Sequence, residues 1–309
     1  MRTKKEEKVV TDEVKSVEIE EMLVQPYKLK YYLDTNAVRS FSPRLKQCRE
    51  VGAFTSIWTI CEMLGRVLKD PQDFNKIQNN CRSIIEAKLC VIKQMPRELN
   101  AAAFGICKPL SISSEIADLM SLLVEATSLE DFLIHISQNN LKDICLFIKE
   151  YDEKGTDYLN KSAELQYDKN GTTKESREWH LHIKDQEKDS CNNRILKYFA
   201  SKELEKYLGP NLIGYLSNEV RDVLSDMILK IYDHSIDIAL IVSAWYADKK
   251  ISYRDRFAKN DDSDMFHLYY VQDDIILVTN DKMLLDNVNA EFPGRAISND
   301  DFKKILDLV

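Results

Sequence analysis

Short apolar runs that end in polar turns alternate with helical segments at both ends of the chain. The segment YKLKYYLD at 27–34 is rich in aromatic residues and stops at the turn DTN. Aromatic and β-branched runs bounded by turn formers are typical of strands. The same pattern predicts further strands at GAFTS (52–56), LCVI (89–92), IILVT (275–279) and RAIS (295–298).

Helical periodicity fills the spaces between these strands. The segment IWTICEMLGRVLKD, which ends before Pro71, and residues 73–88 predict helices, as do the apolar stretches 235–247 and 264–272. Strands that alternate with helices pair in parallel through right-handed crossovers. The pattern therefore predicts an α/β fold with a parallel central sheet.

Four regions differ in composition. Residues 1–26 carry dense mixed charge and predict a mobile N-terminal arm. Residues 27–99 and 231–309 contain all the predicted strands and form the two parts of the core. Residues 100–230 have helical segments and no strong strand signal, which predicts an all-helical insertion. Polar, turn-rich sequence near 152–190 predicts an exposed loop within it.

Composition narrows the class of protein. The net charge of −8 over 309 residues argues against broad electrostatic attraction to nucleic acid, although a local basic groove or bound cations could bring a phosphate backbone close. The seven cysteines contain no CxxC pair and suggest neither a disulfide framework nor a zinc knuckle. No apolar run approaches the ~20 residues that cross a bilayer. We expect a soluble cytoplasmic protein without a membrane partner.

Several acidic residues lie at positions where the pattern of strands and helices alone would not predict a charged side chain. Asp34 and Asp281 directly follow predicted strands, and the carboxyl ends of parallel strands form the ligand crevice of an open sheet. Glu62 lies among apolar neighbours in a predicted helix, where an ionised carboxylate needs a cation or a salt bridge. Arg66, one turn further on, is the alternative partner to a metal ion, and we favour the metal.

A fourth acid, Asp264, opens the helix before the strand at 275–279. Helix capping alone would also favour an acid there. Asp261 or Asp262 could replace it as a ligand, and Asp237 in the preceding apolar helix is a rival. Three or four converging carboxylates suit Mg²⁺ or Mn²⁺, which can activate water and neutralise charge on a phosphodiester.

The order of LDTN, a helical Glu, an Asp that opens a late helix, and LVTND resembles the PIN-domain nuclease family over residues 28–98 and 231–309. The resemblance implies a Rossmann-like three-layer α/β/α fold and metal-dependent endonuclease activity, most often on RNA, as in the toxins of toxin–antitoxin pairs. It carries the family's metal-binding acids onto Asp34, Glu62, Asp264 and Asp281, and its supporting polar residues onto Asn36, Thr279 and Asn280.

The long helical insertion departs from the short toxins of that family. It could cover the crevice, select substrate, form a homodimer or bind a protein partner such as an antitoxin. Two other functions stay open: a catalytically inactive PIN-like scaffold, and a nuclease that acts on structured DNA. The chain has no strongly basic segment, so we rank structured DNA below RNA.

Three further features have weaker claims on function. His267 follows Asp264 by one turn and could face the site, but packing of the ring against the sheet is at least as good an explanation of a histidine there. His180 and His182 form an HxH pair for which we expect solvent exposure rather than metal binding. The basic and aromatic stretch 192–207 could track a phosphate backbone, but a solvated amphipathic helix face is the favoured interpretation.

Overall fold

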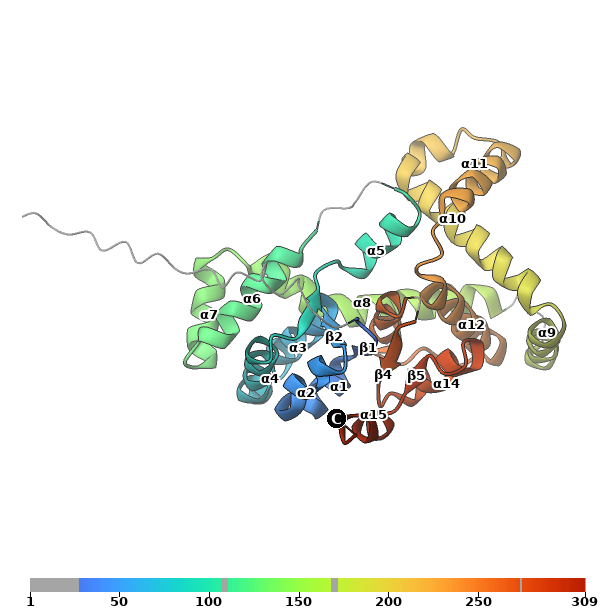
Figure 1. Cartoon of the computed structure of the whole chain (residues 1–309). Helices are drawn as coiled ribbons and strands as arrows, with labels where there is room; N and C mark the ends of the chain where they lie inside the picture. The colour runs from blue at the N-terminus through green and yellow to red at the C-terminus, as the bar shows by residue number, and fades with distance from the viewer. Residues whose placement is uncertain (1–27, 107–110, 168–171, 273, 309) are drawn as a thin grey trace, which may run out of the picture.

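The computed structural model describes residues 28–106, 111–167, 172–272 and 274–308 (Figure 1). The predicted mobile arm at 1–26 lies outside these residues. Within the described residues, no helix is both long enough and apolar enough to cross a membrane.

Five parallel strands form one sheet in the order β3-β2-β1-β4-β5. Their bounds are β1 Tyr31–Leu33, β2 Ala53–Ser56, β3 Cys90–Ile92, β4 Ile276–Val278 and β5 Ala296–Ile297. In the register, Tyr32 of β1 pairs with Phe54 on one side and with Leu277 on the other. All five predicted strands are present, and the predicted parallel sheet is confirmed.

Helices cover both faces of the sheet, as the alternation of side chains along β1 shows. Tyr31 packs on Phe302, which also contacts Phe41, whereas Tyr32 stacks on Tyr270 on the opposite face. Right-handed crossovers place the helices that join β1, β2 and β3 on one face and those leading to β4 and β5 on the other. The helical elements of the core are α1 Thr35–Phe41, η2 Ser42–Arg44, α2 Leu45–Glu50, α3 Ile57–Lys69, η3 Pro71–Asp73, α4 Phe74–Glu86, α12 Asp237–Tyr253, α13 Asp261–Phe266, η4 His267–Tyr270, α14 Lys282–Glu291 and α15 Asn299–Leu306.

Gly52 closes the turn into β2 and brings the first two strands together. Its φ of +82° is a conformation that L side chains rarely adopt, and its carbonyl oxygen accepts a hydrogen bond from the amide of Lys30 at 2.9 Å. A Cβ at this position would collide with the carbonyl oxygen of Lys28. The close approach of the two chains at the start of the sheet therefore requires glycine.

The insertion is helical throughout its described part. Its helices are α5 Pro96–Ala103, α6 Ser113–Glu125, α7 Leu129–Gln138, α8 Lys142–Tyr167, α9 Thr173–Gln186, α10 Lys188–Ile213 and α11 Asn218–Ile231. The expectation of an exposed loop near 152–190 is wrong for the described residues of this stretch, which belong almost entirely to α8, α9 and the start of α10, whereas 168–171 lie outside the described residues. Figure 1 shows α8 crossing the molecule from α6 and α7 on one side to α9 on the other.

Helix α8 joins the insertion to the core. Gly65 of α3 lies against Ile148, and Gly155 of α8 lies so close to Asp262 of α13 that a Cβ there would meet its carboxylate. The hydroxyl of Thr156 donates to the carbonyl oxygen of Lys259 at 2.7 Å. The insertion therefore packs directly on the two core helices that carry Glu62 and Asp264.

Candidate functional site

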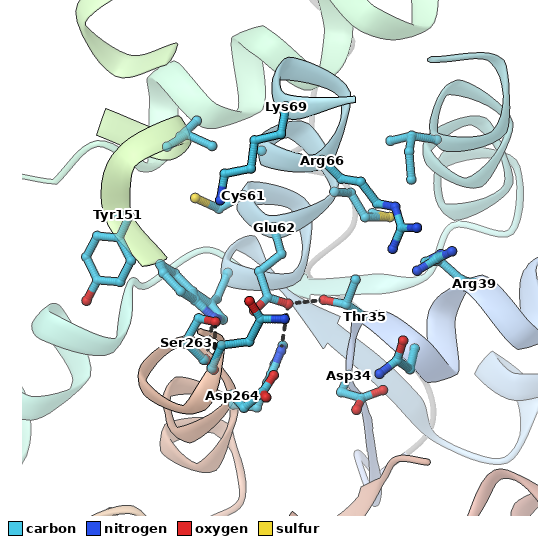
Figure 2. A pocket seen from close by; sticks show the side chains of 18 of the residues that line it. Asp34, Thr35, Arg39, Cys61, Glu62, Arg66, Lys69, Tyr151, Ser263 and Asp264 are labelled. Atoms are coloured by element: carbon cyan, nitrogen blue, oxygen red, sulfur yellow. Dashed lines mark hydrogen bonds and ion pairs between the residues drawn. The ribbon is translucent and has the colours of Figure 1, made fainter. Parts of the chain in front are cut away.

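A cleft of about 350 Å³ lies beyond the carboxyl ends of the strands, between α1, α3, α8 and α13. Asp34, Glu62 and Asp264 line it, and Figure 2 shows Glu62 at the centre of the view, with Asp264 below it to the left and Asp34 below it to the right. The sheet edge predicted to hold the site thus holds a cleft with three of the four predicted acids.

Asp34 is the most deeply buried of these acids, with 2% of its surface exposed. Its backbone follows β1 directly, and its carboxylate caps α1 by accepting from the amide of Ala37 at 2.7 Å. The hydroxyl of Thr279 is a second hydrogen-bond partner. Burial, with a smaller contribution from the charge of Glu62, raises the pKa of Asp34 to about 6.

Glu62 reaches the cleft from the middle of α3 and is held by two donors. Its Oε2 accepts from the hydroxyl of Thr35 and lies 2.8 Å from Nε2 of His267. Arg66, the alternative partner considered from the sequence, pairs with Asp73 instead. The partner that a carboxylate in this apolar helix requires is therefore a histidine.

His267 connects Glu62 to the interior of the sheet. The ring is 2% exposed, and its Nδ1 lies 2.6 Å from the hydroxyl of Tyr32, which contacts Ser56 at 2.8 Å. Burial by itself lowers the pKa of His267, but Tyr32 and Glu62, with Asp34 further off, raise it well above its ordinary value. From the sequence, His267 could face the site, with packing against the sheet at least as good an explanation, and its contact with Glu62 was not predicted.

Asp264 lies on α13 and is the acid whose ionisation is most disfavoured. Burial, then the charge of Glu62, and further the charges of Asp281 and Asp34, raise its pKa to about 8. Asp264 therefore experiences the charges of the other three predicted acids. A bound cation would relieve this repulsion.

The acids considered as substitutes for Asp264 have other partners. Asp261 accepts from the hydroxyl of Tyr246 at 2.5 Å, and Asp237 accepts from the hydroxyl of Tyr232 at 2.8 Å. Asp262 lies against Gly155 of α8 and lines a different pocket. Asp264 is the one of these four acids that lines the cleft.

Asp281 stands slightly apart from the other three acids. It caps α14 by accepting from the amide of Leu284 at 2.8 Å, and it does not line the cleft. Of the supporting residues, Asn36 lines the cleft, and buried Thr279 accepts from the amide of Asp281 at 2.9 Å. Asn280 instead accepts from the amide of Asn299, so it fixes the start of α15 rather than the acids.

The side-chain oxygens at the cleft suit a hard cation, although they do not surround it completely. Most of the candidate ligand atoms at the cleft are carboxylate, hydroxyl or amide oxygens, with His267 and Cys61 as the exceptions, and Mg²⁺ and Mn²⁺ prefer oxygen. Over the part of the chain that the structure describes, no three His, Cys, Asp or Glu side chains lie close enough to form a metal site by themselves. Such an ion would therefore keep several waters, as Mg²⁺ usually does in proteins.

Cationic side chains also line the cleft: Arg39, Arg66, Lys69 and Lys259. Figure 2 shows Arg39 and Arg66 beside each other. The Nε of Arg39 is buried and has no hydrogen-bond partner among the described residues. Burial and then the neighbouring charge of Arg66 lower the pKa of Arg39. An anion between these residues would satisfy both the orphaned donor and the unfavourable pair.

The remaining sequence candidates do not form a second site. His180 is 4% exposed and pairs with Asp248, so the expected exposure of that histidine is wrong, whereas His182 is exposed. In the stretch 192–207 the four cations are already paired with acids. The pairs are Arg194 with Glu187, Lys197 with Asp226, Lys202 with Glu205 and Lys206 with Glu203.

Comparison with known proteins identifies no relative: no protein-family model, no curated protein and no solved structure matches this chain.

Proposed function

We propose that this protein is a PIN-like endonuclease that uses Mg²⁺ or Mn²⁺ to hydrolyse phosphodiester bonds, with RNA as its preferred substrate. One observation carries the proposal. The cleft at the carboxyl ends of the strands is lined by three carboxylates and also by an arginine with an orphaned donor. That combination suits a cation and a phosphate bound side by side.

Each residue has a role that follows from its position. Asp34, Glu62 and Asp264 bind the cation through carboxylate oxygens, and Asp281 adds negative charge from just outside the cleft. A bound Mg²⁺ or Mn²⁺ would supply positive charge at the phosphate and lower the pKa of an attacking water. His267 and Thr35 fix the rotamer of Glu62. Arg39 donates to a phosphate oxygen and stabilises the charge that develops on it.

The distribution of charge supports a substrate held locally rather than by the whole surface. The chain carries a net charge of −8, yet four cations line this one cleft. Long-range attraction to a polyanion is therefore weak, and binding depends on contacts made inside the cleft. The preference for RNA and a role as a toxin with an antitoxin partner rest on the family resemblance alone.

A second candidate function, an inactive PIN-like binding protein, is supported by exposed apolar side chains on α10 and α11. Leu212 is 60% exposed, Val223 58% and Ile231 62%. Exposed apolar residues that gather on neighbouring elements mark interaction surfaces. This function requires no metal, so titration with Mn²⁺ separates the two candidates: a metal site raises thermal stability as the ion binds, and a scaffold without one does not.

Cleavage assays test the proposal directly. Wild-type protein with Mn²⁺ should cut fluorescein-labelled single-stranded RNA, and Asp264→Asn should abolish the activity while the protein stays folded by circular dichroism. Asp237→Asn is the matched control, because this acid lies outside the cleft, and it should cut like wild type.

Single-stranded DNA and a DNA flap tested in parallel decide the class of substrate. If wild type leaves all three nucleic acids intact in Mn²⁺, the enzyme proposal fails. If Asp264→Asn cuts as fast as wild type, the activity does not come from this cleft.

A further inference from the structure

A second groove, which the proposed chemistry does not use, adjoins the acid cleft. It has a volume of about 510 Å³, within the range of about 300–1,000 Å³ that small-molecule pockets occupy. Trp58 and Tyr151 line both the groove and the acid cleft. In the view of Figure 2, Tyr151 lies on the opposite side of Glu62 from Arg39. The two cavities therefore adjoin at these two rings.

Aromatic rings form much of the wall of this groove. Besides Trp58 and Tyr151, it is lined by Phe147, Phe266 and Tyr269. The ring centroids of Trp58 and Tyr151 lie 5.2 Å apart, and those of Trp58 and Phe266 lie 5.1 Å apart, both edge to face. These contacts, and the bond from the indole nitrogen of Trp58 to the carbonyl oxygen of Ser263 at 3.1 Å, hold the rings in fixed orientations.

Phe147 is the ring of this set that remains most open to solvent. It lies on α8, is 39% exposed, and has its centroid 5.3 Å from that of Tyr151. Trp58 by contrast is 3% exposed and packs against the rings of Tyr151 and Phe266. The most accessible ring of the groove, that of Phe147, thus packs on Tyr151, and Tyr151 packs in turn on the buried ring of Trp58.

We propose that this aromatic groove binds an unpaired nucleobase of the same strand whose phosphate enters the acid cleft. The proposal rests on the nuclease function above and names the substrate class, single-stranded nucleic acid. Stacking on aromatic rings tolerates any base, since every base has a π-face. Bases in a duplex have their faces covered by their neighbours, so the groove selects against paired substrates.

The charges at the edge of the groove agree with a strand that continues past it. Arg97 and Lys206 line the groove and can contact phosphates, and two acids, Glu98 and Asp143, line it with them. Lys206 also pairs with Glu203. The contribution of charge here is mixed, so affinity in the groove should come from stacking and depend less on salt than the contacts of Arg39.

Binding measured without catalysis tests the proposal. The probe is a fluorescein-labelled single-stranded RNA of about ten nucleotides, a length within the site sizes of single-strand binders, and EDTA prevents cleavage. Phe147→Ala should weaken binding by roughly 5- to 100-fold, the range measured when a stacking ring is removed. Phe147→Tyr should bind like wild type. Leu146→Ala, an exposed apolar neighbour on the same helix, is the matched control and should also bind like wild type.

A series of RNAs with one abasic position each makes the test specific for a base. At one position in the strand, loss of the base should weaken binding to wild type, and this loss should disappear in Phe147→Ala because the two changes remove the same contact. A duplex of the same sequence should bind more weakly than the single strand.

The outcomes separate the groove from the nuclease. The inference is overturned, and the groove serves another occupant, if wild type binds and cleaves RNA but Phe147→Ala binds it equally tightly. The same conclusion follows if each abasic position weakens binding as much in Phe147→Ala as in wild type. If the abasic and Phe147 effects coincide but no cleavage occurs in Mn²⁺, the base site stands and the enzyme proposal fails. If wild type does not bind RNA in EDTA, the base site is overturned, and cleavage in Mn²⁺ decides the enzyme proposal separately.

Discussion

Replacing Asp34 with asparagine should make the metal-free protein more stable at neutral pH. The folded protein raises the pKa of this carboxyl from 3.8 to about 6, chiefly because it is buried. Each pKa unit corresponds to about 1.4 kcal/mol, so holding the ionised carboxylate costs roughly 3 kcal/mol of folding free energy. Asparagine has nearly the same shape, caps a helix equally well and carries no charge.

The sign of the pH dependence follows from proton binding. Between pH 3.8 and about 6 the folded protein retains the proton on Asp34 that the unfolded chain has released. The unfolding free energy of wild type therefore falls as the pH rises through this window, and the contribution is constant above it. The variant lacks this loss, so its advantage should grow from near zero at about pH 4 to roughly 3 kcal/mol at about pH 7. Removing the charge also eases the ionisation of Asp264.

Urea unfolding in EDTA, followed by tryptophan fluorescence across this range, measures the difference. Mn²⁺ at about a thousand times its dissociation constant should reverse the order, because it stabilises wild type by about 4.1 kcal/mol and has lost a ligand in the variant. Asp237→Asn is the control and should gain nothing at neutral pH, because its carboxylate accepts from Tyr232. A variant that is destabilised equally at every pH would refute the idea of a strained, buried carboxylate.

Two further substitutions test the supports of the site and of the sheet. His267→Phe should lower the unfolding free energy by about 1–3 kcal/mol, because Tyr32 and Glu62 lose a buried partner. A double-mutant cycle with Glu62→Gln should show a non-additive loss, and strict additivity would mean that the two side chains do not act together. Urea unfolding should show that Gly52→Ala lowers the unfolding free energy more than Gly294→Ala does. Both glycines have positive φ, where a Cβ costs about 1–2 kcal/mol, but only at Gly52 would the new Cβ also collide with backbone. Equal losses would show that the contact with Lys28 yields easily.

The sheet was predictable because its strands are short, apolar and bounded by turns. Asp34 could be placed at the cleft for the same reason, since the carboxyl ends of parallel strands share one edge. Asp281 follows the same rule and caps α14 just as Asp34 caps α1, yet Asp281 does not line the cleft. Strand position predicts where the backbone ends, and it does not predict which of two capping acids the cleft reaches.

The stretch near 152–190 was misjudged because polar composition outweighed a narrow apolar stripe. Tyr151, Gly155 and Leu159 recur every four residues, which places them on one face of α8. Gly155 lowers helix propensity, but it permits the close approach to Asp262. Tertiary packing supplied the stability that local sequence did not indicate.

Contacts between residues distant in sequence were beyond reach for a different reason. His267 lies 205 positions from Glu62, and neither residue has a local pattern that points to the other. The orphaned donor of Arg39 likewise becomes visible only when the neighbouring side chains are in place. Spacing rules identify residues that share an element, whereas a pairing between elements depends on the whole fold.

Helix α8 has a consequence for attempts to reduce this protein to its α/β core. Ile148 and Tyr151 belong to the insertion in sequence, yet they are part of the wall of the acid cleft. A shortened chain without 100–230 would retain every predicted acid and expose the flank of α3 where Gly65 now meets Ile148. Its cleft would open to bulk water on that side, and the dielectric screening of the acids and of a bound phosphate would increase. The boundary of the functional unit therefore does not coincide with the boundary of the sheet.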